Sequence, residues 1–295
     1  MSGNLHRFHR GAPLALALAL TAVAPMALAA QSPTAAASAA PDTAASAAID
    51  NVVAGTWRTD ANRARDAARH PVATLRFFDL RPTQTLIEIT PGGGWYSELL
   101  APLLRDHGHY IAAVAAPRDE ESRGEDSAIK RKFAADPTHY GRAAIVEFDP
   151  RAPVFGAPAS ADRVLTFRNV HNWGKSAPAM FAAFFAVLKP GGVLGVVDHR
   201  AATGASYDSV RKTGYLPTDY IVQLATEAGF KLDASSEINA NPRDTRDHPK
   251  GVWTLPPTFA LGDTDKAKYA AIGESDRMTL RFVKPATSAP AGGAR

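Results

Sequence analysis

The stretch from Thr85 to Leu104, TLIEITPGGGWYSELLAPLL, constrains the fold more than any other part of the chain. It begins with a short apolar run that carries one acid, Glu88, and such a run predicts a strand buried on both faces. Three glycines, Gly92, Gly93 and Gly94, follow it, and a pattern with helical spacing comes next. The stretch therefore predicts a strand, a tight glycine loop and a helix.

The glycine loop has two interpretations. Glycines let a backbone approach a ligand closely, and the helix that follows directs its free N–H groups and its positive dipole end at the loop. On this interpretation the loop is a cradle of the nucleotide-binding type. A lone glycine-rich loop can also be only a tight turn, so the elements that follow it must decide.

The N-terminus has the layout of a secretory signal peptide. Residues 1–30 combine Arg7 and Arg10 with an apolar run and with small residues at Ala27 and Ala29. Cleavage there would give a periplasmic or secreted protein with no stable membrane anchor. An uncleaved anchor is the alternative, although the run is short for a membrane span and prolines interrupt it.

The absence of cysteine from the chain excludes disulfides, thiolate catalysis and cysteine-ligated zinc. The strong metal ligands that remain are His, Asp and Glu. The formal net charge is +4, and loss of Arg7 and Arg10 with the signal peptide would leave about +2 on the mature chain. No block of like charge occurs, so we expect no nucleic-acid partner.

Both ends of the chain have compositions that cannot bury enough surface to fold. Segments 31–48 and 286–295 consist mainly of Ala, Ser, Pro and Thr, which predicts a disordered linker and a disordered tail. Residues 49–285 are expected to form one domain in which strands alternate with helices, and this alternation predicts a parallel sheet covered on both faces. The expected strands are 85–89, 109–115, 143–148, 163–167, 193–197, 230–238 and 279–283.

This succession resembles the class I S-adenosylmethionine-dependent methyltransferases from about Thr83 to Lys284. Glu88 with its glycines stands where that family has an acid in its first strand and a glycine-rich loop around the methionine part of the cofactor. FRNVHNW and VLKPGGVLGVVD resemble the end of the family's fourth strand and the helix, turn and strand that follow. The resemblance implies an α/β, Rossmann-like methyltransferase fold with a seven-stranded, mostly parallel sheet, an antiparallel last strand and S-adenosylmethionine as cofactor.

A narrower resemblance covers nearly all of the mature chain. PGGGWYSELLAPLL, INANPRDTRDHPKGVWTLPP and AIGESDRMTLRFVKP look like a group of exported bacterial proteins called predicted methyltransferases. Two positions depart from the wider family. Its Gly-x-Gly-x-Gly reads Thr90 to Gly94 here, so the first glycine is lost, and Ala115 or Ala116 stands where an acid would bind the ribose hydroxyls. The next acids, Asp119 and Glu120, follow several residues later.

In an open parallel sheet, ligands bind outside the carboxyl ends of the strands. By resemblance, Asp149 after the third strand would contact the adenine amino group, whereas an ordinary loop-capping aspartate is the alternative. The residues expected to bind the cofactor are Glu88, Gly92, Gly93, Gly94, Asp149 and Asn169.

Two histidines, His171 and His199, end neighbouring strands if the sheet has the family's order. A neutral imidazole can take the proton from an attacking oxygen or nitrogen, so we expect a general base and a substrate anchor. Hydrogen bonds to loop backbone are the alternative for either ring. With Asp198 and His248 they could instead form a metal site, but no tight histidine spacing supports one, and we assign no metal ligands.

The segment 239–276 joins the last two strands and leaves from the same edge as the glycine loop, so we expect it to cover the site. A long, polar, proline-bearing connection of this kind is typically a lid or a binding loop. Its charges could also pair with one another and hold the loop in place. The residues expected to bind substrate are Asn172, Trp173, Asp198, Arg200, Asn241, Arg246 and His248, with Arg246 able to grip a carboxylate or phosphate.

Three functions remain open from the sequence. The first is methyl transfer from S-adenosylmethionine to a small acceptor whose identity the sequence does not determine. The second is an exported protein of methyltransferase fold that binds a small ligand or partner without transferring a methyl group, which the compartment favours because the donor is made in the cytoplasm. The third is a metal-dependent hydrolase or lyase built around His199. The oligomeric state is not determined either.

Overall fold

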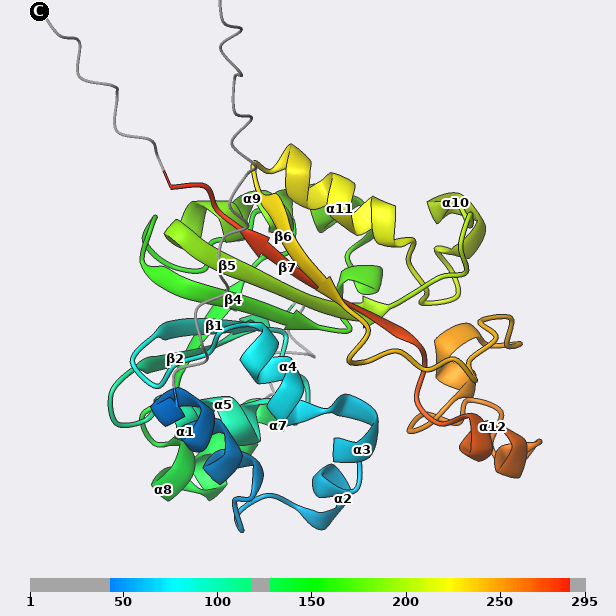
Figure 1. The fold of residues 1–295 in the computed structure, drawn as a ribbon, viewed down its shortest axis with the longest axis horizontal. Helices are drawn as coiled ribbons and strands as arrows, with labels where there is room; N and C mark the ends of the chain where they lie inside the picture. Colours follow the sequence, from blue (N-terminus) through cyan, green and yellow to red (C-terminus); the bar gives the residue numbers. More distant parts are fainter. Residues whose placement is uncertain (1–42, 118–127, 287–295) are drawn as a thin grey trace, which may run out of the picture. The chain divides into compact units, whose positions relative to one another are not determined.

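A computed structural model describes residues 43–117 and 128–286 of the chain, so the expected signal peptide, Asp119, Glu120 and the tail after residue 286 lie outside the described residues. Seven strands form one sheet in the order β3-β2-β1-β4-β5-β7-β6 (Figure 1). The strands are β1 (Thr85–Ile89), β2 (His109–Ala115), β3 (Ala144–Phe148), β4 (Ala161–Phe167), β5 (Leu188–His199), β6 (Lys231–Ser236) and β7 (Arg277–Val283).

The pairing of the strands confirms the expected fold class. Strand β1 runs parallel to β2 on one side and to β4 on the other, and β3 and β5 extend the parallel sheet outwards. Strand β7 inserts antiparallel between β5 and β6. The strand order reverses between β1 and β4, and in open α/β sheets ligands bind in the crevice at such a switch point.

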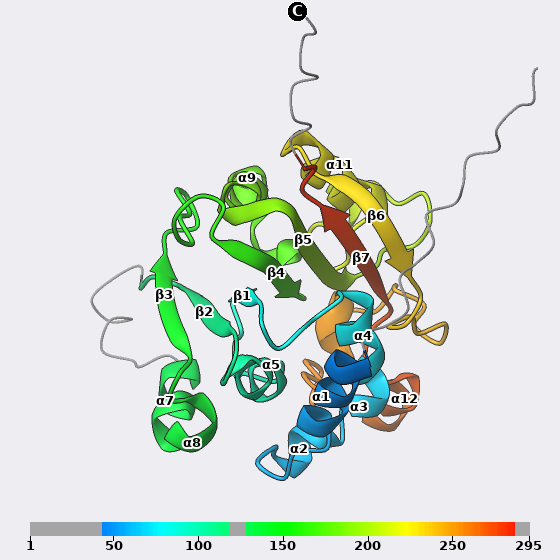
Figure 2. The same cartoon turned by 60° about the vertical axis from the view of Figure 1, so that its left-hand side comes forward.

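Alternate residues of the strands face two separate apolar cores. Leu86 of β1 packs with helices α1 (Thr43–Val53), α4 (Pro71–Phe77), α5 (Ser97–Leu104), α7 (Ala128–Ala135) and α8 (Pro137–Tyr140). Ile87 faces the other side, where α9 (Ala177–Val187) and α11 (Thr218–Glu227) cover the sheet. We call the core around Ile87 the first core and the core around Leu86 the second core. Figure 2 shows the two helical layers. A strand buried on both faces cannot alternate apolar with polar residues, and this explains the unbroken apolar runs.

Most strand boundaries shift by a few residues from the sequence expectations, and three differences are larger. Helix α1 begins at Thr43, so the prediction of disorder is wrong for residues 43–48, because Ala48 and Ile49 pack on the second core. The segment between Thr59 and His70, whose spacing predicts one helix, forms two short helices, α2 (Asp60–Arg63), which Thr59 caps, and α3 (Asp66–Arg69). Strand β5 begins at Leu188, because the expected turn at Gly191 and Gly192 pairs with Lys284 beyond the end of β7.

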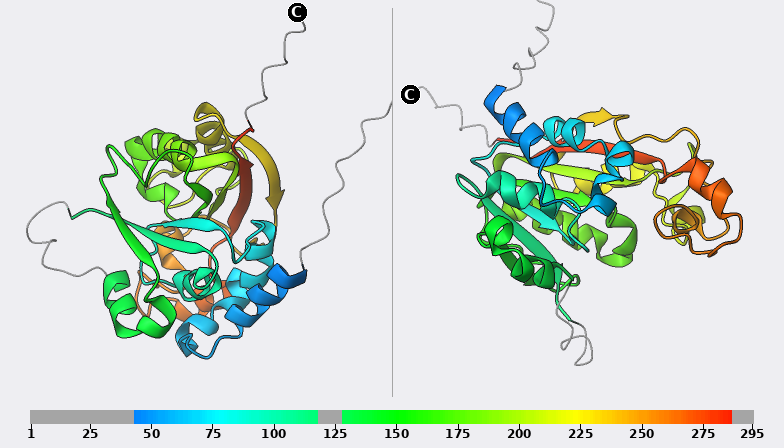
Figure 3. Two further views of the ribbon diagram at one scale, coloured as in Figure 1. Left: turned by 90° about the vertical axis from the view of Figure 1, so that its left-hand side faces the viewer. Right: turned by 90° about the horizontal axis from the view of Figure 1, so that it is seen from below.

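The remaining short elements lie in the loops. They are η1 (Val170–Asn172) and η2 (Gly174–Ser176) after β4, α10 (Tyr207–Val210) after β5, and η3 (Gly251–Thr254) and α12 (Lys266–Ile272) in the connection 239–276. That connection, coloured orange, extends beyond the ends of the strands (Figures 1 and 3). No helix among the described residues is long and apolar enough to cross a membrane.

Glu88 ties three elements together inside the second core. Its Oε2 accepts hydrogen bonds from Ser97 Oγ of α5 at 2.9 Å and from the Tyr110 hydroxyl of β2 at 2.5 Å. Burial raises the pKa of Glu88 to about 7, although both hydrogen bonds act in the opposite direction. The internal partners that a buried acid requires are therefore hydroxyl groups of the protein.

This raised pKa predicts a pH-dependent contribution to stability. Between the ordinary value of 4.5 and about 7 the folded protein binds more protons at Glu88 than the unfolded chain does, so the contribution is full at low pH and is lost as pH rises. The loss amounts to roughly 3 kcal/mol of unfolding free energy. Glu88→Gln does not ionise, so its stability relative to the natural protein should improve by about this amount between pH ~5 and pH ~8. Urea unfolding of both proteins at the two pH values measures the change. An unchanged difference would contradict the assignment.

Candidate functional site

The glycine loop lies at the switch point between β1 and β4 and presents an open backbone. Gly92 and Gly94 have φ angles of +59° and +78°, in the left-handed region that favours glycine. A Cβ added at Gly94 would come within 2.7 Å of Ile129, whereas one added at Gly93 would meet no described atom within 4 Å. Gly94 is therefore required for packing, and Gly93 faces open space, as a ligand cradle requires.

Thr90, at the start of the loop, has a left-handed backbone conformation. Its φ is +52°, a conformation that costs a β-branched residue roughly 1–2 kcal/mol. Its N–H continues the parallel pairing to Ala113 O at 2.8 Å. The side chain of Asn169 donates to Ile89 O at 2.9 Å and to Thr90 O at 3.3 Å, which joins the end of β4 to the loop. Thr90 thus adopts a backbone conformation that favours glycine.

A cavity of about 410 Å³ lies on one side of this loop, at the ends of β2 and β3, and Ala116, Asp149 and Ser176 line it. We call it the β2–β3 cavity. Asp149 Oδ1 accepts the backbone N–H of Arg151 at 2.9 Å. This hydrogen bond, together with a second one from the Arg151 side chain, lowers the pKa of Asp149. This contact supports the interpretation of Asp149 as a loop-capping residue. The same carboxylate also lines the β2–β3 cavity, where contact with the adenine amino group was expected. Strand β2 ends at Ala115, so no acid stands at the position where one would bind the ribose hydroxyls.

A second cavity, of about 210 Å³, lies on the other side of the loop, at the ends of β4 and β5. We call it the β4–β5 cavity. The residues that line it include Arg168, His171, Asn172, His199, Trp253 and Ser275. Trp253 and the neighbouring prolines come from the connection 239–276. The structure therefore places this connection over the two histidines, as we expected.

His171 and His199 lie side by side in this cavity, with ring centroids 5.0 Å apart. His171 Nδ1 is 3.0 Å from Asp198 Oδ1, and His199 Nδ1 is 2.5 Å from Ser275 Oγ. Burial lowers the pKa of His199 well below its usual value, and the charges of His171 and Arg168 lower it further. His199 is therefore a neutral imidazole at pH 7, whereas a carboxylate orients His171.

Asp198 supports the two histidines and is itself shielded from the cavity. It is fully buried, its Oδ2 accepts the Val170 N–H at 2.8 Å, and its Oδ1 accepts the His199 N–H at 2.8 Å. Its side chain therefore has internal partners in place of the substrate that we expected. Ligand atoms of His171, Asp198 and His199 all lie within 4.8 Å of one another, a spacing that suits a metal ion. Both carboxylate oxygens are already hydrogen-bonded, so such an ion would have to displace existing contacts.

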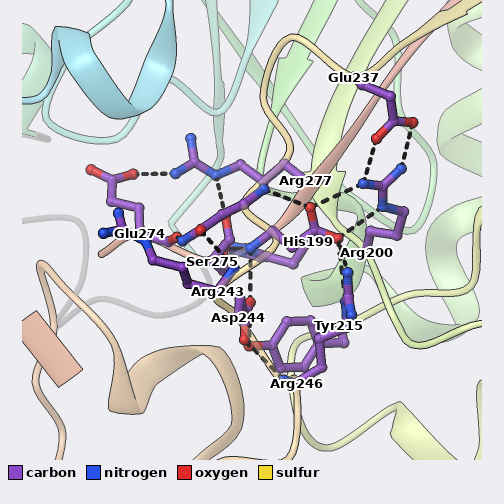
Figure 4. Close-up of polar contacts among 12 residues, drawn as sticks. His199, Arg200, Tyr215, Glu237, Arg243, Asp244, Arg246, Glu274, Ser275 and Arg277 are labelled. Atoms are coloured by element: carbon purple, nitrogen blue, oxygen red, sulfur yellow. Dashed lines mark hydrogen bonds and ion pairs between the residues drawn. The ribbon is translucent and has the colours of Figure 1, made fainter. Parts of the chain in front are cut away.

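The charged residues expected to bind substrate pair with buried carboxylates instead. Asp276 accepts from Arg200 Nε at 2.9 Å and from Arg246 Nη2 at 2.6 Å, and Arg200 also pairs with Glu237 at 2.7 Å (Figure 4). Asp244 accepts from the Tyr215 hydroxyl at 2.8 Å and lies 2.8 Å from His248 Nε2. These bonds hold the connection 239–276 against the sheet, which was the alternative interpretation of its charges.

The other expected substrate residues are divided between the cavities and the core. Asn241 donates from its side chain to Ile272 O at 2.8 Å and Glu274 O at 2.7 Å, and it lines a separate cavity of about 380 Å³ beside α3. Trp173 packs on Phe184 with ring centroids 5.6 Å apart, so its ring belongs to the first core. Asn172 is exposed and lines the β4–β5 cavity. Direct substrate contact stays a prediction for Asn172.

Sequence reasoning missed the groups that contribute most charge to the β4–β5 cavity. Arg168 and Glu274 line it. Three further arginines that do not line the cavity form ion pairs with Glu274, namely Arg65, Arg69 and Arg277. A charged residue directly after the apolar run of β4 was the available signal for Arg168. Arg65 and Arg69 lie in a segment of mixed charge that is indistinguishable from a solvated helix face in sequence alone.

No protein-family model and no curated protein matches the sequence. Among solved structures, an S-adenosylmethionine-dependent methyltransferase from Aquifex aeolicus is similar, with a TM-score of 0.51 and 12% identity over 75% of this chain and 93% of that one. The [4+2]-cyclase SpnF aligns with a TM-score of 0.49 and 18% identity over 80% of this chain and 85% of that one. The first likeness agrees with the strand order of the sheet. The chain therefore has the fold of the class I S-adenosylmethionine-dependent methyltransferases.

Proposed function

We propose that the protein transfers a methyl group from S-adenosylmethionine to a small acceptor bound in the β4–β5 cavity. The arrangement of the carboxyl edge carries the proposal. The open face of Gly93 lies in the loop after β1, and the strand order puts the β2–β3 cavity on one side of β1 and the β4–β5 cavity on the other. A donor and an acceptor bound in these cavities would meet at the glycine loop, and bringing reactants together is a large part of catalysis.

The residues present fit the cofactor in most respects. Gly92 and Gly93 are open above their backbone, Thr90 has a left-handed backbone conformation, and Asp149 lies at the β2–β3 cavity. Glu88 and Asn169 hydrogen-bond within the protein and support the loop from within. Ala115 leaves the ribose hydroxyls without the usual acid, which favours weaker binding. When bound, S-adenosylmethionine supplies an electrophilic methyl group on a sulfonium centre.

The two histidines have distinct roles in this proposal. His171, whose Nδ1–H donates to Asp198, keeps a lone pair on Nε2 and takes the proton from the acceptor oxygen or nitrogen as it attacks. Asp198 then stabilises the imidazolium. His199, neutral and bonded to Ser275, anchors the acceptor by a hydrogen bond. Trp253 and the prolines of the connection 239–276 restrict the access of water.

We retain the proposal that residues 1–30 are a cleaved signal peptide and that the mature protein is periplasmic or secreted. The charges and small residues of that segment support it. Ligand binding without methyl transfer is the second candidate function, and the absence of an acid at Ala115 is the observation that favours it. Calorimetric titration with S-adenosylmethionine separates this candidate from the first, because methyl transfer requires that the cofactor bind.

Titration of the purified protein with S-adenosylmethionine and its demethylated product should produce saturable heat. Gly93→Leu should weaken binding at least tenfold, because its side chain would fill the open face of the loop without meeting other atoms. The thermal midpoint should stay unchanged for the same reason. Ala202→Leu, at an exposed position on another loop, is the matched control and should bind normally. Absence of heat from the folded natural protein would reject the cofactor, and equal affinity in Gly93→Leu would show that the loop is only a turn.

The lowered pKa of His199 predicts a neutral ring across the physiological range. A free histidine titrates near pH ~6.5, whereas His199 should still be neutral at that pH because burial lowers its pKa. Nitrogen chemical shifts of the imidazole groups measure this directly, and His199→Gln assigns the signal. A transition near the ordinary value would remove the basis for treating His199 as an uncharged anchor.

A metal-dependent hydrolase or lyase is a third candidate, favoured only by the spacing of His171, Asp198 and His199. We expect protein purified without chelator to contain less than about one tenth of an equivalent of bound metal, because both Asp198 oxygens are hydrogen-bonded. Elemental analysis decides the question. One equivalent of a transition metal that His171→Ala removes would favour the third candidate over methyl transfer.

A further inference from the structure

Four arginines converge on a single carboxylate beside the β4–β5 cavity. Glu274 lies 2.6 Å from Arg65, 3.4 Å from Arg69, 4.0 Å from Arg168 and 2.6 Å from Arg277. These residues come from α3 and the residue before it, from the end of β4 and from the start of β7. The cluster therefore carries more positive charge than its own carboxylate neutralises.

The excess charge is held away from bulk water. Only 2% of the Arg69 side chain and 3% of the Arg277 side chain are exposed. Buried charges are costly unless they are paired and hydrogen-bonded. Even if Asp198, which contacts both histidines of the cavity, is counted as a second carboxylate, the four arginines exceed the carboxylates by two charges. Arg69 also stacks over the Trp95 ring at 4.6 Å, which compensates part of the cost. An anion at this place would offset more of it.

The hydrogen-bonding capacity of the cluster is also incompletely used. Nη2 of Arg65 and Nη2 of Arg69 are buried without a hydrogen-bond partner among the described residues. Burial lowers the pKa of Arg69 to about 9 and that of Arg168 to about 10, and repulsion between the guanidinium groups contributes to both shifts. The same cations, acting against burial, lower the pKa of Glu274 to about 2. The carboxylate is thus permanently charged and still does not satisfy its partners.

Arg168 presents this charge to the cavity. Its side chain is 27% exposed, its ion pair with Glu274 is long at 4.0 Å, and it makes no side-chain hydrogen bond within the part of the chain that the structure describes. Its φ of +61° places a non-glycine residue in the left-handed region, a strained conformation for a residue with a side chain. Its N–H bonds to Val197 O at 2.7 Å, so the pairing of β4 with β5 maintains this conformation.

We propose that the β4–β5 cavity binds a small anionic molecule, a carboxylate or a phosphate, through the guanidinium of Arg168. The planar guanidinium group matches both kinds of anion with two parallel hydrogen bonds. His199 and Asn172 line the same cavity and can bond the rest of the ligand, and its volume of about 210 Å³ restricts the ligand to a small molecule. As an assignment of the methyl acceptor this rests on the proposed function, whereas anion binding itself does not.

Inorganic phosphate and malonate, each titrated calorimetrically in the absence of S-adenosylmethionine, test the proposal. At least one of them should bind saturably, and Arg168→Gln should weaken that binding at least tenfold, the loss expected for one charged hydrogen bond. Arg243→Gln is the matched control. Arg243 is exposed and lines the neighbouring 380 Å³ cavity instead, so its loss should change the affinity less than twofold.

The variants must be folded for the comparison to count, and circular dichroism establishes this. If Arg168→Gln does not fold, Arg168→Lys keeps the charge but loses the paired hydrogen bonds, and it should bind the anion more weakly than the natural protein. Saturable heat from neither anion, equal affinity in the natural protein and the Arg168 variant, or loss of binding in Arg243→Gln alone would overturn the proposal. Because no cofactor is added, these outcomes are independent of whether S-adenosylmethionine binds.

Discussion

The pairing of β1 in parallel with β2 on one side and with β4 on the other is the constraint on which the rest of the molecule depends. It places Glu88 opposite Ala112 and Leu165, deep inside the sheet, and it ends all of these strands at one edge. The residues proposed to bind ligands or act in catalysis lie at that edge. They are the glycine loop after β1, Asp149 after β3, Arg168 after β4 and His199 at the end of β5. The geometry of the candidate site is therefore a consequence of strand order.

Buried carboxylates then fasten the connection between β6 and β7 over this edge. Asp276 and Asp244 each collect several donors, and the resulting network joins the end of β5 to residues of the connection. Such a network stabilises one position of the chain only if its members are mutually satisfied, as they are here. It also explains why Arg246 and His248 are held by internal partners. A charge used to hold a lid in place is not available to bind a ligand.

Strain and unbalanced charge gather at the same edge. Thr90 and Arg168 follow two adjacent strands, and both adopt a left-handed conformation that is uncommon outside glycine. Arg65, Arg69, Arg168 and Arg277 share one neighbouring carboxylate in a poorly solvated place. Local costs of this kind persist where the surrounding fold maintains them, and they are concentrated at functional sites. In this protein they lie beside a cavity that also holds two histidines.

The sequence by itself determined the order and type of the main elements, the sheet class, the glycine loop, the proximity of His171 to His199, and the placement of the last connection over the site. Most of these follow from local patterns and from the rule that parallel strands end at one edge, whereas the proximity of the two histidines followed from the strand order that the family resemblance implies. Only the tertiary structure decided which charges pair with one another. Arg246 meets Asp276, Trp173 enters the core, and Arg69, remote in sequence, reaches Glu274. Pairing between distant side chains depends on three-dimensional proximity and on burial, neither of which leaves a periodic signal in the chain.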